Sequence, residues 1–227
     1  MSVPTAQLPL DLGHRPALDR DAFLVTDSNA AAVGWIDRWP AWPMPALVLE
    51  GPPGAGKTHL ASVWRARADA GLIEGAALDA AAVPRLLDTG RPLVVEQADR
   101  APEQSLLHLY NGFAERGLGL LLTAGDAPAR WGTRLPDLSS RLKALPVATI
   151  LAPDDRLVHA ILIKLFFDRQ LIVADDVVDF LTARMERSFE AARALVTAID
   201  TASLAARRPV TVPFVRDVFR SLYPDET

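Results

Sequence analysis

The residues best suited to chemistry form one segment, Gly51–Thr58, with the sequence GPPGAGKT. In this pattern the glycines let backbone N–H groups curl around phosphates, the lysine amine reaches the β- and γ-phosphates, and the final hydroxyl ligates Mg²⁺. An apolar run precedes the segment and a helical pattern follows it, which is the setting that a phosphate loop needs. The segment therefore predicts a bound nucleotide, ADP or ATP, with Mg²⁺. We assign the phosphate contacts to Gly51, Pro53, Gly54, Ala55, Gly56, Lys57, Thr58 and His59.

An acidic residue, Glu96, follows a second apolar strand at 93–95. Phosphate-loop ATPases usually carry a carboxylate here that holds the Mg²⁺ shell, and a second acid beside it that orients the attacking water. Glu96 suits the first role, shared with Thr58, unless it is simply a strand-end carboxylate. Gln97 occupies the second position, so we expect slow intrinsic hydrolysis. On a continuing strand Asp99 would point to the face opposite Glu96 and would replace the missing acid only in part.

Three further residues have two readings each. Thr123 and Asp126 follow the strand predicted at 119–124, at the edge where ligands of open α/β sheets bind, so either can sense the γ-phosphate or merely cap the next turn. Arg141 lies on a later segment that we expect at the surface. An arginine there is either solvated or enters a neighbouring subunit's site to neutralise transition-state charge.

The elements that must position these residues alternate along the chain. Strands are predicted at 23–25, 46–49, 72–78, 93–95, 119–124 and 148–151, helices at 30–38, 59–67, 80–87 and 103–117, and a turn or short helix at 137–142. The alternation predicts an α/β fold over residues 21–152, with a parallel sheet flanked by helices. Helices predicted at 155–169, 175–183, 188–206 and 212–222 form a small all-α lid domain over 153–227. Residues 1–20, rich in proline and turn formers, predict a flexible arm.

Composition narrows the class of protein. Half of the 227 residues are apolar, so a proper core is available. The chain has no cysteine, which excludes disulfides and Cys-ligated metals and suits a reducing cytosol. No apolar run approaches a membrane span, and the net charge of −4 argues against broad electrostatic binding of nucleic acid. We expect a cytoplasmic protein whose partners are a nucleotide and other proteins.

Four motifs in the same order resemble the AAA+ domain of DnaA-type initiators. They are Phe23–Val25 with Ser28-Asn29, the phosphate loop with His59-Leu60, Leu107–Asn111, and Leu135–Leu142. A full initiator continues into a helix-turn-helix domain after its lid, and this chain ends near the lid, so we expect no direct sequence-specific DNA binding. The chain is most similar to the Hda family, whose members are DnaA-related.

The resemblance implies partners and a mechanism. In the Hda family a regulator bound to the DNA polymerase III sliding clamp (its β subunit) docks on ATP-loaded DnaA and promotes hydrolysis of DnaA's ATP, which negatively regulates replication initiation. Arg141 matches the family's arginine finger in trans. The arm resembles the clamp-binding peptide, with a glutamine for a polar subsite and leucines for an apolar pocket. Its residues are Gln7, Leu8, Pro9, Leu10, Asp11 and Leu12.

The resemblance also implies an adenine pocket near Phe23 to Asn29. At one position this sequence departs from the family's pattern. The lid arginine that senses nucleotide aligns with Glu190, so that either Arg187 or Arg193 supplies the contact from a neighbouring turn, or the contact is missing. We assign it to Arg193 and expect ADP as the bound nucleotide, with a homo-oligomer as a possibility.

Two other classes compete with this interpretation. A self-contained motor or helicase-loader ATPase would turn over ATP alone and respond to single-stranded DNA, but Gln97 and the acidic net charge argue against it. A small nucleotide kinase would need a cluster of lid arginines that closes over a phosphorylated acceptor. The candidates Arg184, Arg187 and Arg193 are too few for this, and we expect them on different faces of the lid.

Overall fold

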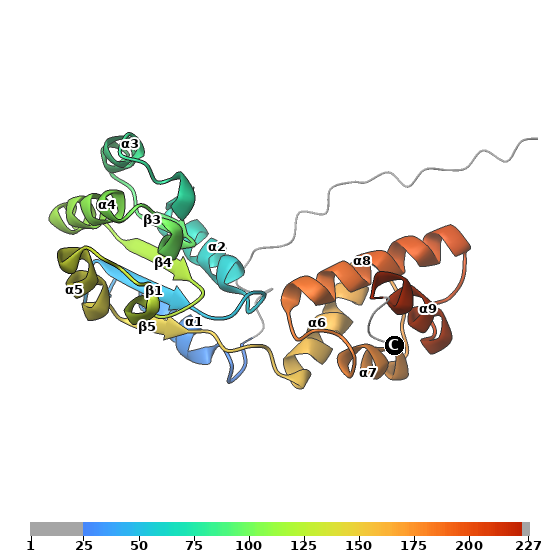
Figure 1. Cartoon of the computed structure of the whole chain (residues 1–227). Helices are drawn as coiled ribbons and strands as arrows, with labels where there is room; N and C mark the ends of the chain where they lie inside the picture. The colour runs from blue at the N-terminus through green and yellow to red at the C-terminus, as the bar shows by residue number, and fades with distance from the viewer. Residues whose placement is uncertain (1–24, 224–227) are drawn as a thin grey trace, which may run out of the picture.

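The computed structural model describes residues 25–223, which form an α/β domain and a helical domain joined by a short connection (Figure 1). The predicted arm at 1–20, with the peptide from Gln7 to Leu12, lies outside the described residues, and so does Phe23. Within residues 25–223 no helix is both long and apolar enough to cross a membrane.

A parallel five-stranded sheet organises the α/β domain, in the order β2-β3-β4-β1-β5. Because β1 is flanked by β4 and β5, the segment that leaves its carboxyl end emerges inside the sheet rather than at an edge. The strands are β1 (Ala46–Glu50), β2 (Gly71–Glu74), β3 (Leu93–Glu96), β4 (Leu120–Ala124) and β5 (Val147–Thr149).

Helices cover both faces of the sheet, because successive strand residues point to opposite sides. Leu47 and Leu49 of β1 pack with α1 (Ala30–Asp37) and α2 (Lys57–Ala68). Ala46 and Val48 pack with the helices of the other face, which are α3 (Ala82–Asp88), α4 (Glu103–Arg116) and α5 (Pro136–Ala144). Within residues 25–223, three short 3-10 helices lie in the connections: η2 (Gly75–Ala77), η3 (Ala98–Arg100) and η4 (Pro128–Arg130).

The lid has its own apolar core, made by four helices. Two of them begin at side-chain caps: Asp154 accepts the Leu157 N–H before α6, and Ser188 accepts the Ala191 N–H before α8. The helices are α6 (Asp155–Asp168), α7 (Asp175–Thr182), α8 (Phe189–Ala206) and α9 (Val212–Leu222). The predicted fold class, an α/β domain followed by an all-α lid, is confirmed.

One predicted strand is wrong in its length. The strand expected over 72–78 ends at Glu74, and η2 follows. The reason is a close backbone approach, because a Cβ on Gly75 would lie 2.2 Å from the carbonyl oxygen of Gln97. Glycine allows the chain to turn against β3 there, and apolar periodicity carries no sign of such a contact.

Candidate nucleotide-binding site

The phosphate loop runs from the end of β1 into α2 and is shaped by glycines. Gly54 (φ +69°) and Gly56 (φ +100°) take left-handed conformations, and α2 begins immediately at Lys57. The Lys57 amine donates to the carbonyl oxygens of Gly51, at 2.6 Å, and Pro52, at 2.8 Å. The loop therefore surrounds its own lysine, and the N–H groups of the first turn of α2 face the helix N-terminus, where an anion can bind.

Glu96 lies beside the loop at the end of β3. Its Oε2 accepts the Thr123 hydroxyl at 2.7 Å and lies 3.4 Å from the Thr58 hydroxyl. A hydroxyl next to a carboxylate is the donor set that suits Mg²⁺, which keeps several waters and takes one or two protein oxygens plus phosphates. Thr58 and Glu96 thus fit the predicted metal site.

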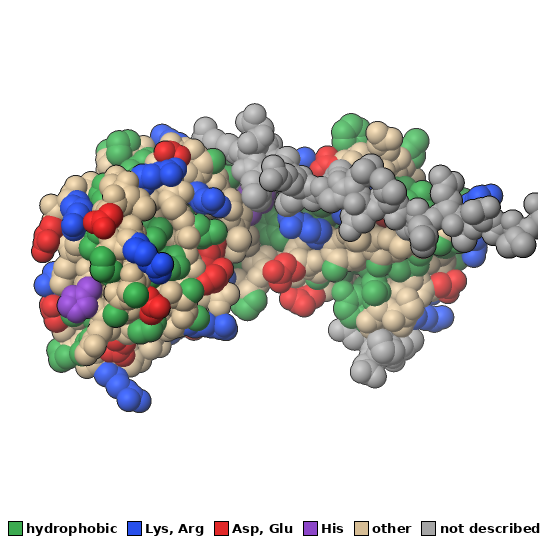
Figure 2. All heavy atoms as spheres, turned by 90° about the horizontal axis from the view of Figure 1, so that it is seen from above, with side chains coloured by type: hydrophobic (Ala, Val, Ile, Leu, Met, Phe, Trp, Pro, Cys, Tyr) green, Lys and Arg blue, Asp and Glu red, His purple; other side chains and the backbone are tan. Residues whose placement is uncertain are grey.

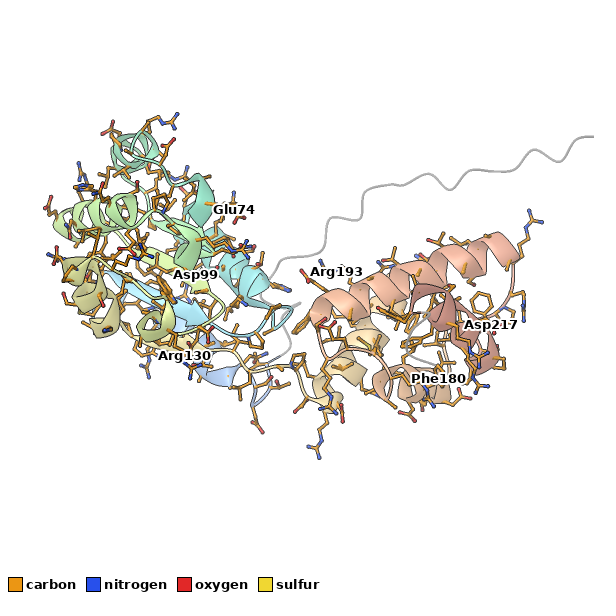
Figure 3. The ribbon with its side chains drawn as sticks, viewed as in Figure 1. Glu74, Asp99, Arg130, Phe180, Arg193 and Asp217 are labelled. Carbon is orange, nitrogen blue, oxygen red and sulfur yellow. The ribbon has the colours of Figure 1, made fainter. Side chains whose placement is uncertain are left out.

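The chain turns sharply after Glu96, which corrects the expectation for Asp99. Gln97 adopts a left-handed conformation (φ +51°), its N–H donates to the Thr123 hydroxyl at 3.1 Å, and Asp99 falls in η3 rather than on a strand (Figure 3). The alternation of strand faces therefore does not apply to Asp99. The Asp99 carboxylate partly offsets the lowering of the Lys57 pKa by burial.

Charges from both domains converge on the loop. Burial lowers the pKa of Lys57, and the nearby carboxylates of Glu96, Asp99 and Glu190 partly offset this effect. Burial also lowers the pKa of His59, and the guanidinium of Arg193 lowers it further. The unfavourable burial of the Lys57 ammonium is relieved when phosphate oxygens approach it, so the site favours an anionic ligand.

The lid contacts the loop directly. The Phe189 N–H donates to the Gly54 carbonyl at 3.0 Å, and Ser188, only 4% exposed, packs so closely that a Cβ on Gly54 would lie 2.4 Å from the Ser188 Cβ. The start of α8 is thus seated on the phosphate loop. This contact joins positions far apart in the chain, and sequence reasoning missed it.

Gly54→Ala is expected to lift the lid from the loop. The added Cβ clashes with Ser188, so the amide hydrogen of Phe189 should exchange about 10-fold faster or more, which corresponds to about 1.4 kcal/mol of lost protection. Hydrogen exchange measured by mass spectrometry over residues 186–191 checks this. Gly90→Ala is the matched control, because Gly90 is also left-handed (φ +62°) but has nothing within 4 Å of an added Cβ. Equal exchange in the two variants would contradict the seated lid.

Of the two candidate lid arginines, the structure brings Arg193 to the site. Arg193 lies on α8, on the side of the lid that faces the α/β domain, and its charge acts on His59 of α2 (Figure 3). Arg187 instead pairs with Asp155 within the lid, at 2.8 Å. This pair is exposed, with the two side chains 60% and 59% accessible.

Asp126, which we considered either as a γ-phosphate sensor or as a cap of the next turn, has its contacts in that turn. It forms an exposed ion pair with Arg130 at 3.1 Å, and its carbonyl accepts the Trp131 indole N–H. Thr123, the other candidate on this strand, is the residue that faces Glu96. Thr123 is the fourth residue of β4 and is only 1% exposed, so its hydroxyl needs a hydrogen-bond partner inside the protein. For this reason Thr123 is a better candidate than Asp126, which lies in the following turn, for a contact with Glu96.

Of the remaining predicted residues, Ala55 and Pro53 belong to the loop, and Asn29 lies at the start of α1. Ala55 is buried under the loop, and Pro53 is exposed at its tip. Asn29 is 1% exposed beside the start of α1, where its side-chain oxygen accepts the Thr26 N–H at 2.9 Å. This segment is tied to the domain connection, since the Ser28 carbonyl accepts the Leu151 N–H.

Arg141 lies on α5, on the opposite face of the sheet from α2. Its side chain is 40% exposed, pairs with Asp137 at 2.9 Å and lies 5.9 Å from the ring centre of Tyr110. These contacts do not connect it with the loop of its own chain. The guanidinium is available to a second protein if the exposed pair with Asp137 opens.

Comparisons with known proteins agree with this architecture. Residues 155–219 match the family model described as "Hda, lid domain". Domain III of the replication initiation protein DnaA from Thermotoga maritima is similar with a TM-score of 0.79 and 15% identity, over 91% of this chain and 97% of that one.

Two further solved structures share the fold. AMPPCP-bound DnaA from Aquifex aeolicus has a TM-score of 0.73 and 14% identity, over 92% of this chain and 70% of its own. The RuvB Holliday junction branch migration motor of Thermotoga maritima has a TM-score of 0.73 and 15% identity, over 92% and 73%. In agreement with the resemblance drawn from the motifs, the lid matches the Hda lid-domain model over residues 155–219, and the chain shares its fold with DnaA domain III and RuvB.

Proposed function

We propose that this protein is a nucleotide-bound adaptor that docks on ATP-loaded DnaA while held by the sliding clamp, and that it stimulates hydrolysis of DnaA's ATP. The observation that carries the proposal is an intact phosphate loop beside Glu96 with Gln97 in place of a second acid. The site is built to hold phosphates, but the residue that would activate water is an amide, which cannot accept a proton at neutral pH. The nucleotide then sets conformation, and the chemistry occurs in the partner.

The bound nucleotide is an adenine nucleotide with Mg²⁺, and ADP in the resident state. The chemistry of the loop supports a nucleoside di- or triphosphate, and a DnaA of the same fold holds the ATP analogue AMPPCP. Lys57 would bind the β-phosphate oxygens, Thr58 and Glu96 would hold the metal and its waters, and Arg193 would approach from the lid. Bound Mg²⁺ would neutralise phosphate charge and fix the orientation of the phosphates.

Arg141 is the residue that we assign to the partner's site. An arginine finger must leave its own domain surface, and the exposed ion pair of Arg141 is worth only about 0.3–0.5 kcal/mol for an i,i+4 helix pair. Releasing the guanidinium therefore costs little. In the partner's site it would neutralise charge that develops on the transferred phosphoryl group.

The segment from Gln7 to Leu12 would bind the clamp as an extended peptide. Replacing Gln7 and Leu10 together with alanine is expected to weaken clamp binding about 100-fold or more, because the polar anchor and a leucine anchor are lost together. Immobilised clamp and purified variant give the measurement. Replacing Ser2 and Thr5 with alanine is the control within the same arm, and it should leave clamp binding unchanged; retained affinity in the double variant at Gln7 and Leu10 would rule out this role.

The alternative is a self-contained DnaA-type or helicase-loader ATPase acting on DNA. The shared fold with RuvB, a branch migration motor, supports considering it. Figure 2 shows basic and acidic side chains interspersed over the visible face of the α/β domain, without an extended basic region for a nucleic-acid backbone. ATP turnover by the purified chain, with and without single-stranded DNA, discriminates between the two. The adaptor predicts slow turnover that DNA does not raise, and DNA-stimulated turnover would favour the motor.

A further inference from the structure

The first turn of α8 places a carboxylate next to the phosphate loop. Phe189 is fixed by its N–H donation to the Gly54 carbonyl, and Ser188 is packed against Gly54 itself. Glu190 is the next residue of the helix, so its backbone has little freedom to move from the loop while α8 stays seated. The position of Glu190 is therefore set by the contact between the two domains.

We propose that Glu190 is a specificity-determining residue that makes this site favour a nucleoside diphosphate over a nucleoside triphosphate. The proposal rests on the nucleotide-binding function proposed above. It names the lid carboxylate as the cause of the discrimination, and like-charge repulsion as its physical basis.

The charges around Lys57 support this assignment. Three carboxylates act on the Lys57 ammonium, and two of them, Glu96 and Asp99, belong to the α/β domain. Glu96 already accepts the Thr123 hydroxyl and would be balanced by Mg²⁺. Glu190 comes from the lid and is exposed, and over residues 25–223 it makes no hydrogen bond or ion pair. Its carboxylate is therefore the negative charge that the lid adds near Lys57, the residue that would bind the terminal phosphates of a nucleotide.

A triphosphate differs from a diphosphate by about one negative charge at that end. Bringing this charge close to an unpaired carboxylate is unfavourable, and the repulsion is stronger near a protein surface than in bulk water. The guanidinium of Arg193, three residues further along α8, acts on His59 instead of Lys57. The lid thus carries a negative group near the lysine and a positive group near His59.

The test compares ADP with a non-hydrolysable ATP analogue, each with Mg²⁺, by titration calorimetry on the full chain. Wild type should bind ADP about 10-fold tighter than the analogue. Glu190→Gln should raise affinity for the analogue about 10-fold and affinity for ADP less than about 3-fold, a change of about 1.4 kcal/mol against one of less than about 0.7 kcal/mol. Glu186→Gln is the matched control, because it removes an exposed lid carboxylate that does not act on Lys57, and it should leave both affinities unchanged.

Three results would overturn the proposal. An unchanged ratio of the two affinities in Glu190→Gln, or a wild type that binds the analogue as tightly as ADP, would show that Glu190 does not discriminate, while the nucleotide site itself would stand. A wild type that binds neither nucleotide would overturn the nucleotide site and this proposal together.

Discussion

Arg141→Ala is expected to abolish the stimulation of DnaA's ATP hydrolysis, lowering the stimulated rate about 100-fold or more, to the unstimulated level. An arginine finger is worth about 10³–10⁵ in rate where it completes a phosphoryl-transfer site, because it neutralises charge that appears only in the transition state. Release of labelled phosphate by DnaA, with this protein and the clamp loaded on DNA, gives the measurement.

The variant should remain folded and bind the clamp. Arg141 contributes one exposed ion pair with Asp137 and a distant contact with the Tyr110 ring, so its removal costs little stability. Lys143→Ala is the control, because Lys143 is an exposed cation two residues away on α5. It should stimulate as the wild type does. An Arg141 variant that also stimulates fully would show that the finger is a different residue.

Lys57→Ala is expected to weaken nucleotide binding about 100-fold or more, because it removes the charge-assisted contacts to the phosphates. The apo fold should survive the change. Burial lowers the pKa of Lys57 in the folded protein, so the unfolded chain holds this proton more strongly, and the charged amine opposes folding below its ordinary pKa. Replacing Lys57 with alanine removes this charge at neutral pH, and with it an unfavourable contribution to the free energy of folding.

Calorimetry with ADP and a thermal unfolding scan measure the two effects separately. Lys164→Ala supplies the control, since Lys164 is a lysine on the lid surface paired with Asp168 within α6. It should bind ADP normally. Wild-type affinity in the Lys57 variant would contradict the assignment of the loop as the phosphate site.

The α/β domain could be predicted because its signals are local. Short apolar strands alternate with helical patterns, and the phosphate loop needs β1 before it and α2 after it, so the motif fixes its own surroundings. The lid helices could also be predicted, since Asp154 and Ser188 are capping residues that lie directly before segments with the apolar periodicity of a helix.

The remaining features depend on contacts between distant residues. The left-handed turn at Gln97 takes Asp99 off the strand and into η3, and nothing in the local pattern marks a non-glycine residue for that conformation. The packing of Ser188 on Gly54 is set by the docking of two domains, so it leaves no periodic trace in either segment. Thr123 faces the acid because β3 and β4 are neighbours in the sheet, an order that the sequence does not state.

The two proposed functional regions lie on opposite faces of the sheet. The proposed nucleotide site lies where the loop, Glu96 and the start of α8 meet, and a bound nucleotide would affect the lid through the contact between Gly54 and Phe189. Arg141 lies on the other face of the sheet. Such an arrangement suits a protein whose own nucleotide stabilises a conformation while a separate surface acts on a partner.

The most direct test is to follow two nucleotides in one reaction. DnaA is preloaded with ATP carrying one label and this protein with nucleotide carrying another, and they are mixed with the clamp on DNA. The account predicts that the ATP on DnaA is converted to ADP, while the nucleotide on this protein stays unchanged. Conversion of the nucleotide on this protein, with the ATP on DnaA left intact, would contradict it.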